Sequence, residues 1–243
     1  MAHRGASAEL PENTLAAFER AVEVGADAVE FDVRLTADGV PVVLHDAGVG
    51  RTTDGGGVLH DLTLAQVKGF RIQGGHDVPT LEEALRTLSG RIGVDLEIKN
   101  IPGEPDFTAD AEPVVDASLR ALDEVGFSGP VLLSSFNPRS LAHARAVAPD
   151  VPTGLLTEYS VEAAAALAFA SREGHPWVLP FVGKLNEAGD GFVEQVHVAG
   201  ILLGTWIVDD PETAVALLRA GLDAVATNDP AAVVAARHAA FGA

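Results

Sequence analysis

Apolar runs rich in β-branched residues alternate with alanine-rich helical stretches along the whole chain. A helical pattern lies between most successive runs, as in residues 14–24 before Gly25 and residues 213–220 before Gly221. Glycine most readily adopts the left-handed conformation in which many helices end. This alternation of strand and helix predicts a parallel sheet covered by helices. The strand candidates are residues 2–4, 28–33, 40–45, 94–98, 131–135, 153–156, 177–181, 201–208 and 224–227.

Two of these strand candidates lie too close together in the sequence to be parallel neighbours. Only a short turn centred on T-A-D-G (36–39) separates strand 28–33 from strand 40–45. A parallel crossover takes roughly a dozen residues or more, so these two strands must form an antiparallel hairpin. The remaining strands predict a TIM-type (β/α)8 barrel, with strand 40–45 lying over its mouth. The alternative is a doubly wound open sheet.

The domain organisation follows from what the chain lacks. No linker, repeat or low-complexity segment divides it, so residues 1–243 are predicted to form a single domain. The glycine-rich, polar region at about 48–77 contains one short helical pattern, at 64–70. We expect this region to be a small insertion on the catalytic face of the barrel.

Charge and composition exclude several classes of partner. The chain has 16 basic and 35 acidic residues, and its formal net charge is −19. Such a surface repels nucleic acids and anionic membranes, so we expect a small-molecule substrate and no stable membrane association. With no cysteine, any metal must be held by oxygen or imidazole ligands. No apolar stretch is long enough to span a bilayer and no signal peptide opens the chain, so we expect a cytoplasmic protein.

Charged residues alternate on two of the predicted strands. Glu30 and Asp32 share one face of their strand, and Asp95, Glu97 and Lys99 share one face of another. Neighbouring carboxylates repel each other unless a cation lies between them, which indicates a metal site. The plain alternatives are a chance pairing of acids in an acidic chain and, for the second group, an exposed edge strand.

The hairpin brings a histidine toward these carboxylates. With a four-residue turn at 36–39, His45 would lie opposite Glu30, and with a two-residue turn at 38–39 it would lie opposite Asp32. Either even-length turn puts His45 on the carboxylate face of the sheet. An odd-length turn or a bulge would not.

The charges of this predicted site favour a bound divalent ion. Three carboxylates, Glu30, Asp32 and Glu97, are set against two cations, Arg4 and Lys99, so the pocket carries one net negative charge. That pocket would repel a phosphodiester monoanion, whereas one divalent metal would bring its charge to about +1. Ligation by carboxylate oxygens alone favours Ca²⁺ or Mg²⁺ over zinc.

Other candidates have both a structural and a functional interpretation. Asn13 is expected to cap the helix that follows it, and contact with the site is the alternative. Asp46 could orient His45 or simply begin a turn, and Trp206 could line the site or belong to the core. Residues 134–136 (S-S-F) end a predicted strand and could line the pocket. No supporting group of residues surrounds the remaining histidines, which are His60, His76, His143, His175, His197 and His238.

Five short motifs lie in order along the chain: A-H-R-G (2–5), P-E-N-T (11–14), E-F-D-V (30–33), L-H-D (44–46) and E-I-K (97–99). Their order and spacing resemble the glycerophosphodiester phosphodiesterase family, and the likeness extends to T-N-D-P at 227–230, so it covers essentially the whole chain. The resemblance implies a TIM-type barrel in which Glu30, Asp32 and Glu97 bind the metal.

The same resemblance implies roles for the remaining residues. His3 and His45 would be the general acid and base pair, with His45 as the base and His3 as the acid. Arg4 and Lys99 would hold phosphate oxygens, and Trp206 would lie beside the substrate. Members usually have several apolar residues before the first histidine, so the resemblance implies either a start upstream of Met1 or a shortened first strand.

The implied reaction is hydrolysis of a glycerophosphodiester to glycerol 3-phosphate and an alcohol, with one divalent ion, Ca²⁺ or Mg²⁺. The nucleophile is either water or a neighbouring hydroxyl of the substrate. Two rivals remain: a phospholipase D-like enzyme acting on lysophospholipid or sphingolipid headgroups, and a noncatalytic phosphoglycerol-binding protein. The short insertion argues against the first, and the paired histidines argue against the second.

Overall fold

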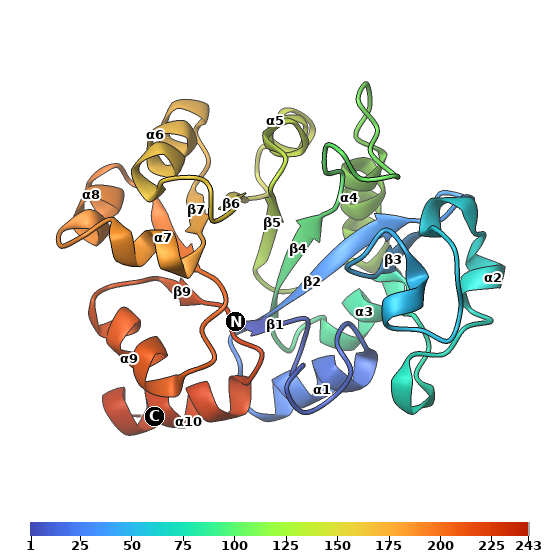
Figure 1. Cartoon of the computed structure of the whole chain (residues 1–243), viewed down its shortest axis with the longest axis horizontal. Coiled ribbons are helices and arrows are strands. Elements are labelled where there is room, and N and C mark those ends of the chain that lie inside the picture. Colours follow the sequence, from blue (N-terminus) through green and yellow to red (C-terminus); the bar gives the residue numbers. More distant parts are fainter. Residues whose placement is uncertain (243) are drawn as a thin grey trace.

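The computed structural model describes residues 1–242, and its parallel strands curl into one sheet whose first and last strands meet (Figure 1). Going round the sheet, the strands are β1 (Ala2–His3), β2 (Ala28–Leu35), β4 (Gly93–Ile98), β5 (Val131–Ser135), β6 (Thr153–Thr157), β7 (Trp177–Pro180), β8 (Leu202–Thr205) and β9 (Ala224–Val225). Ala2 pairs with Thr227 just beyond β9, and the His3 N–H donates to the Thr227 carbonyl at 2.8 Å. The predicted TIM-type barrel is therefore confirmed.

Helices cover the outside of the sheet, as Figure 1 shows. They are α1 (Leu15–Glu23), α3 (Leu81–Leu88), α4 (Pro113–Val125), α5 (Pro138–Val147), α6 (Ala163–Glu173), α7 (Val182–Glu187), α8 (Phe192–Val198), α9 (Pro211–Arg219) and α10 (Pro230–Phe241). Local sequence sets their ends. Proline opens α4, α5, α9 and α10, where its missing N–H costs no hydrogen bond, and Gly126 and Gly174 end α4 and α6 in the left-handed conformation.

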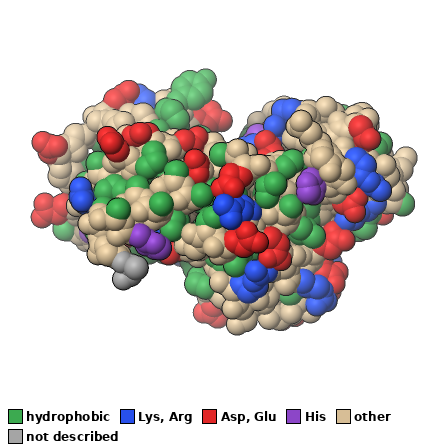
Figure 2. All heavy atoms as spheres, turned by 90° about the horizontal axis from the view of Figure 1, so that it is seen from below, with side chains coloured by type: hydrophobic (Ala, Val, Ile, Leu, Met, Phe, Trp, Pro, Cys, Tyr) green, Lys and Arg blue, Asp and Glu red, His purple; other side chains and the backbone are tan. Residues whose placement is uncertain are grey.

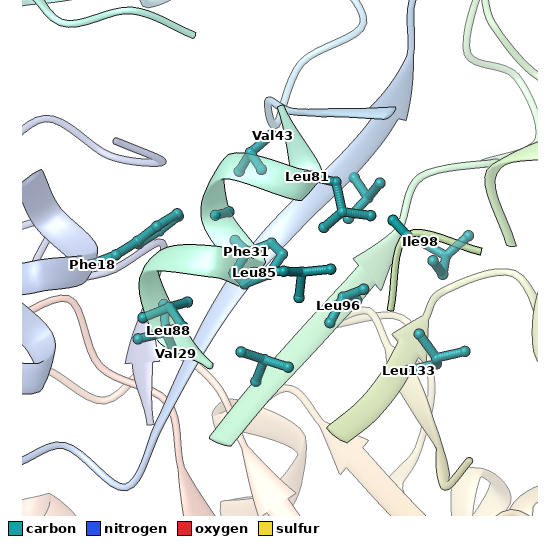
Figure 3. Packing of buried hydrophobic residues seen from close by; sticks show 14 of the residues in the cluster. Phe18, Val29, Phe31, Val43, Leu81, Leu85, Leu88, Leu96, Ile98 and Leu133 are labelled. Carbon is teal, nitrogen blue, oxygen red and sulfur yellow. The ribbon is translucent and has the colours of Figure 1, made fainter. Parts of the chain in front are cut away.

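Alternation along β2 and β4 separates the core from the barrel interior. Phe31 and Leu96 point outward, where they pack with α1 and α3 in the cluster that Figure 3 shows. Burying side chains of this size stabilises the fold by about 2 kcal/mol each. Because strand side chains alternate, Glu30, Asp32 and Glu97 must then point the other way, into the barrel. The same packing that forms the core therefore directs the carboxylates toward one another.

The hairpin is confirmed, but its register is not the one expected. Strand β3 (Pro41–Val43) pairs antiparallel with β2, with Val33 opposite Val43 and Leu35 opposite Pro41. The loop is therefore residues 36–40, an odd number, and the ladder continued past Val43 would bring His45 opposite Phe31. The expected register, with His45 opposite Glu30 or Asp32 in the ladder, is wrong. His45 lies beyond the end of β3, so the ladder does not decide where its side chain points.

The region between β3 and α3 has its own small structure. It contains three single-turn helices, η1 (Val49–Arg51), η2 (Leu59–Asp61) and η3 (Gln73–Gly75), and the short helix α2 (Leu64–Val67). The pattern at 64–70 thus forms a shorter helix than expected, opened by a capping box between Thr63 and Gln66. Val49, Leu59 and Ile72 lie in a separate apolar cluster beneath this region. No helix in the described part of the chain is long and apolar enough to cross a bilayer.

Candidate active site

A cavity of about 320 Å³ opens where several barrel strands end. Seven of the eight residues predicted for the site line it: His3, Arg4, Glu30, His45, Glu97, Lys99 and Trp206. The eighth, Asp32, is fully buried beside them. Residues from the start, the middle and the last fifth of the sequence therefore meet at one end of the barrel.

Three carboxylates form the centre of this site. One oxygen each from Glu30, Asp32 and Glu97 lies within 4.8 Å of the others, and all three residues are buried. The sheet register places them there, because Asp32 on β2 is the lateral neighbour of Glu97 on β4. Strand β4 lies between β2 and β5, which excludes the exposed edge strand considered as the alternative.

Two cations neutralise part of this negative charge. The Lys99 ammonium lies 2.9 Å from Asp32 Oδ1 and also contacts Glu97, and Arg4 Nε lies 3.2 Å from Asp32 Oδ2. Burial alone would raise the pKa of Asp32, but Lys99 and Arg4 lower it well below its usual range. Asp32 is therefore ionised at neutral pH.

Among the three carboxylates, Glu30 is the one with a buried oxygen that lacks both a hydrogen-bond donor and a nearby cation's nitrogen within the described part of the chain. Its Oε2 accepts a hydrogen bond from the Arg4 N–H at 3.0 Å, while its buried Oε1 has no hydrogen-bond partner among residues 1–242. Burial, followed by the charges of Asp32 and Glu97, raises the pKa of Glu30 well above its usual range. An orphaned carboxylate oxygen beside two further carboxylates fits a hard divalent cation, which is bound by oxygen donors.

The two histidines are held by different partners. His3 Nδ1 lies 2.7 Å from Asn228 Oδ1, and its Nε2 lies 3.9 Å from Glu30 Oε2. Burial, and then the Arg4 charge, lower the pKa of His3 to about 4. His45 Nδ1 lies 2.6 Å from Asp46 Oδ1. Of the two interpretations of Asp46, this contact supports the one in which it orients the His45 ring.

Asn13 contacts the site, which was the alternative to the expected helix cap. Thr14, not Asn13, caps α1 by accepting a hydrogen bond from the Ala17 N–H. The Asn13 amide instead donates to Asp32 Oδ2 at 2.8 Å. Asn13 and Arg4 are the only non-glycine residues within 1–242 that have positive φ, 57° in each case. Both contact Asp32, and backbone strain of this kind is concentrated at functional sites.

Aromatic side chains form one wall of the cavity. Trp206 follows β8 directly and donates its indole N–H to the Leu179 carbonyl at 2.9 Å. Phe136 and Phe181 both meet Trp206 edge to face, with ring centroids 5.4 and 5.5 Å away. Of the S-S-F segment, Ser134 and Phe136 line the cavity, whereas Ser135 donates to the Ile98 carbonyl.

Some residues near the site were missed by reasoning from the sequence. Arg51, in the region after β3, contacts Asp46 and donates to Glu12 at 2.6 and 3.0 Å, and Glu12 in turn accepts from Arg4. The sequence indicates Asn228 only as part of the T-N-D-P motif. The motif could have pointed to it, because a short polar residue directly after a barrel strand lies at the catalytic end. The six remaining histidines all lie outside this cavity, as expected.

Comparisons with known proteins identify the family and agree with the fold. A family model described as the glycerophosphoryl diester phosphodiesterase family matches residues 3–232. A glycerophosphodiester phosphodiesterase of Caldanaerobacter subterraneus is 34% identical, over 96% of this chain and 95% of that protein. An Oleispira antarctica phosphodiesterase, solved in complex with the product sn-glycerol-3-phosphate, has a TM-score of 0.82 at 30% identity, over 97% of this chain and 94% of that one. A Thermotoga maritima glycerophosphodiester phosphodiesterase has a TM-score of 0.80 at 26% identity, covering 97% and 96%.

Proposed function

Since the chain belongs to the glycerophosphoryl diester phosphodiesterase family, we propose that it hydrolyses small glycerophosphodiesters to glycerol 3-phosphate and an alcohol in this cavity. The observation that carries the proposal is the grouping of three buried carboxylates, two cations and two histidines around one space. Each class of group has a separate task in splitting a phosphodiester.

The carboxylates would hold one divalent metal ion. Glu30, Asp32 and Glu97 offer oxygen donors only, which favours Ca²⁺ or Mg²⁺. A cation bound there supplies Lewis-acid polarisation of a phosphate oxygen. Burial, and then the charges of Asp32 and Glu97, raise the pKa of Glu30, and a cation bound there would favour the ionised carboxylate.

Arg4 and Lys99 would bind the phosphate. Both line the cavity, and their ion pairs with Asp32 and Glu97 hold them in place before substrate arrives. Donors fixed in advance stabilise the charge that develops on phosphate oxygens without the cost of rearrangement. The backbone of Arg4 is fixed as well, since its N–H donates to the side chain and the carbonyl of Glu30.

His3 and His45 would transfer the protons, His45 as the base and His3 as the acid. Asp46 accepts from His45 Nδ1, so the Nε2 of the neutral ring is free to accept a proton. Burial and Arg4 favour the neutral form of His3, and the negative charge of a bound diester opposes that effect. The acid then protonates the departing alkoxide.

A second candidate is supported by a groove beside the cavity. A groove of about 490 Å³, lined by apolar residues such as Ile101, Pro102 and Phe169, shares Phe136 and Leu156 with the catalytic cavity. Its position fits a substrate whose glycerol carries an acyl chain, as in a lysophospholipid. Glycerophosphocholine and lysophosphatidylcholine distinguish the two functions, because they share the phosphodiester but differ in the chain.

The proposal is tested by measuring release of glycerol 3-phosphate from glycerophosphocholine. Wild type should be active, a chelator should abolish the activity, and Ca²⁺ or Mg²⁺ should restore it. His3→Ala and His45→Ala should each lower kcat by at least about a hundredfold, because positioned acids and bases contribute that much. Arg71→Ala, outside the cavity, is the control.

Three outcomes would count against the proposal. Full activity in chelator would exclude the metal, and near-native turnover by either histidine variant would exclude that acid or base. Release of choline from lysophosphatidylcholine with a kcat/KM well above that for glycerophosphocholine would transfer the proposal to the second candidate.

A further inference from the structure

Asn228 lies directly behind His3 and is itself held in a fixed orientation. Its Oδ1 is 2.7 Å from His3 Nδ1, and its Nδ2 donates to Asp209 Oδ2 at 2.9 Å. The Ser7 hydroxyl also lies 3.0 Å from Asn228 Oδ1. We propose that Asn228, oriented by Asp209, is a positioning residue that sets the ring orientation and tautomer of His3 for proton transfer. This inference rests on the proposed function of His3.

The amide orientation of Asn228 follows from the chemistry of its neighbours. A carboxylate only accepts hydrogen bonds, so Asp209 requires that the NH₂ end of the amide point toward it. The oxygen end must then point toward His3 and Ser7. An oxygen only accepts, so His3 Nδ1 carries a proton in this contact. The acid form of the ring carries a second proton on Nε2, which it gives to the departing alkoxide, and the ring is then neutral with its proton on Nδ1. The remaining ring nitrogen, Nε2, is the one that points toward the carboxylates, 3.9 Å from Glu30 Oε2.

The backbone around Asn228 is held independently of its side chain. Asp209 Oδ1 accepts from the Asn228 N–H at 2.7 Å and lies 3.1 Å from the Thr227 hydroxyl. Thr227 also forms the closing contact with β1. These contacts do not involve the Asn228 side-chain amide, whose two ends connect Asp209 with His3 and Ser7. A side chain in that position acts on the histidine, much as the partners that orient catalytic histidines do elsewhere.

The test uses two esters of glycerol 3-phosphate that differ in their leaving groups. Choline is a poor leaving group and depends on a general acid, whereas p-nitrophenol leaves readily without one. His3→Ala should therefore lose far more activity on the choline ester than on the nitrophenyl ester. Asn228→Ala should show the same preference with a smaller loss, roughly tenfold in kcat on the choline ester and little change in KM.

A double-mutant cycle separates positioning from general damage. If Asn228 acts only through His3, adding Asn228→Ala to His3→Ala should cause no further loss on the choline ester. Asn137→Ala is the matched control: Asn137 is a buried asparagine that caps α5 and hydrogen-bonds the Asn100 carbonyl, away from His3. It should lower stability without any leaving-group preference.

Exchanging the two side chains gives a second variant that is independent of truncation. Asn228→Asp alone would set two carboxylates against each other and should lower kcat on the choline ester at least as much as Asn228→Ala. Adding Asp209→Asn restores a donor at 209 and an acceptor at 228, so the exchanged pair should recover most of the lost activity. Recovery would support the inference even if Asn228→Ala folded poorly.

The results distinguish the proposed role of Asn228 from the proposed acid role of His3, on which it rests. If His3→Ala loses equally on both esters, the acid role of His3 fails and the inference fails with it. If His3→Ala loses more activity on the choline ester than on the nitrophenyl ester but Asn228→Ala loses equally on both, only the role of Asn228 is overturned. The role of Asn228 would also be overturned if the loss of kcat in the double variant equalled the product of the two single losses, or if the exchanged pair recovered no activity. Either result would leave His3 as the acid.

Discussion

His175 lies between α6 and β7, far in the sequence from the catalytic motifs, and it is 2% exposed. Its Nδ1 is 2.9 Å from the Thr153 hydroxyl, and its Nε2 has no hydrogen-bond partner in the described chain. Burial, and then the charge of Arg145, lower the pKa of His175 below its usual value of 6.5. This ring therefore stays neutral in the folded protein while it would be protonated in the unfolded chain at mildly acidic pH.

We predict that His175 makes the protein less stable in acid. A lowered pKa stabilises the fold fully above pH 6.5, and that stability is lost as the pH falls through the folded-state pKa. His175→Gln cannot be protonated, so its free energy of unfolding should fall less steeply between pH 7.5 and 5. The slopes should differ by up to about 1.4 kcal/mol per pH unit, one full proton.

Urea unfolding at several pH values measures these slopes, and His238→Gln, at an exposed position, is the control. Parallel curves for wild type and His175→Gln would show that His175 takes no part in acid unfolding.

Individual residues of the site were predictable where strand alternation decides which way a side chain points. Glu30, Asp32 and Glu97 fall into that class, because the core requires their neighbours to face outward. Asn13 and Asn228 do not. A short amide can cap a helix or reach a distant carboxylate, and only the folded backbone selects between these partners. The catalytic and binding roles assigned to the site remain predictions.

Among the elements, the region after β3 contacts residues that hold the catalytic side chains. Through Arg51 it contacts Asp46, which holds His45, and Glu12, which holds Arg4. The Arg51 guanidinium thus connects this region, through Asp46 and Glu12, to two residues that line the cavity, His45 and Arg4. Its planar fork suits two carboxylates at once, which a lysine ammonium cannot match in geometry.

We expect Arg51→Ala to lower kcat roughly tenfold through looser placement of His45 and Arg4, with Arg51→Lys restoring little. Stability should change by less than about 1 kcal/mol, because the side chain is 46% exposed. Arg71→Ala is matched to it: this arginine lies in the same region, is 49% exposed and pairs with Asp77. The two variants are compared by steady-state kinetics and thermal unfolding. Equal kcat values for the two variants would show that Arg51 does not contribute to catalysis.

The hairpin illustrates which features of an element can be predicted. Spacing alone established that β2 and β3 are antiparallel, since no crossover fits between them. The register escaped prediction because it depends on hydrogen bonds within the loop, which the spacing of the two strands does not reveal. The Thr36 hydroxyl accepts from the Val40 N–H at 3.0 Å and donates to Asp38, which stabilises the loop at 36–40. Such local contacts compete with regular turns, and composition does not distinguish them.

At the scale of the whole molecule, the charge is strongly negative. The formal net charge is −19, and Figure 2 shows acidic side chains spread over one face, with basic side chains beside many of them. The cavity contains Arg4 and Lys99, but an approaching anion first meets the field of the entire surface. Salt shortens the range of that field, from about 30 Å at 10 mM to about 8 Å at 150 mM.

We therefore predict that salt helps an anionic substrate to bind. Between 10 and 150 mM NaCl, kcat/KM for glycerophosphoglycerol, a monoanion, should rise about two- to threefold. The value for glycerophosphocholine, whose charges cancel, should stay nearly constant. Steady-state kinetics on both substrates at fixed metal concentration gives the comparison. A fall with salt for the anionic diester would mean that the local positive charge of the cavity outweighs the surface.

The contact between His3 and Asn228 joins residues 225 positions apart in the chain. The three residues of the carboxylate cluster are synthesised within the first 97 positions, whereas His3 lacks its neighbour until β9 and Asn228 have been synthesised and docked. Full activity thus requires the last barrel strand, β9, to be in place, so it reports closure of the barrel and not formation of the carboxylate cluster.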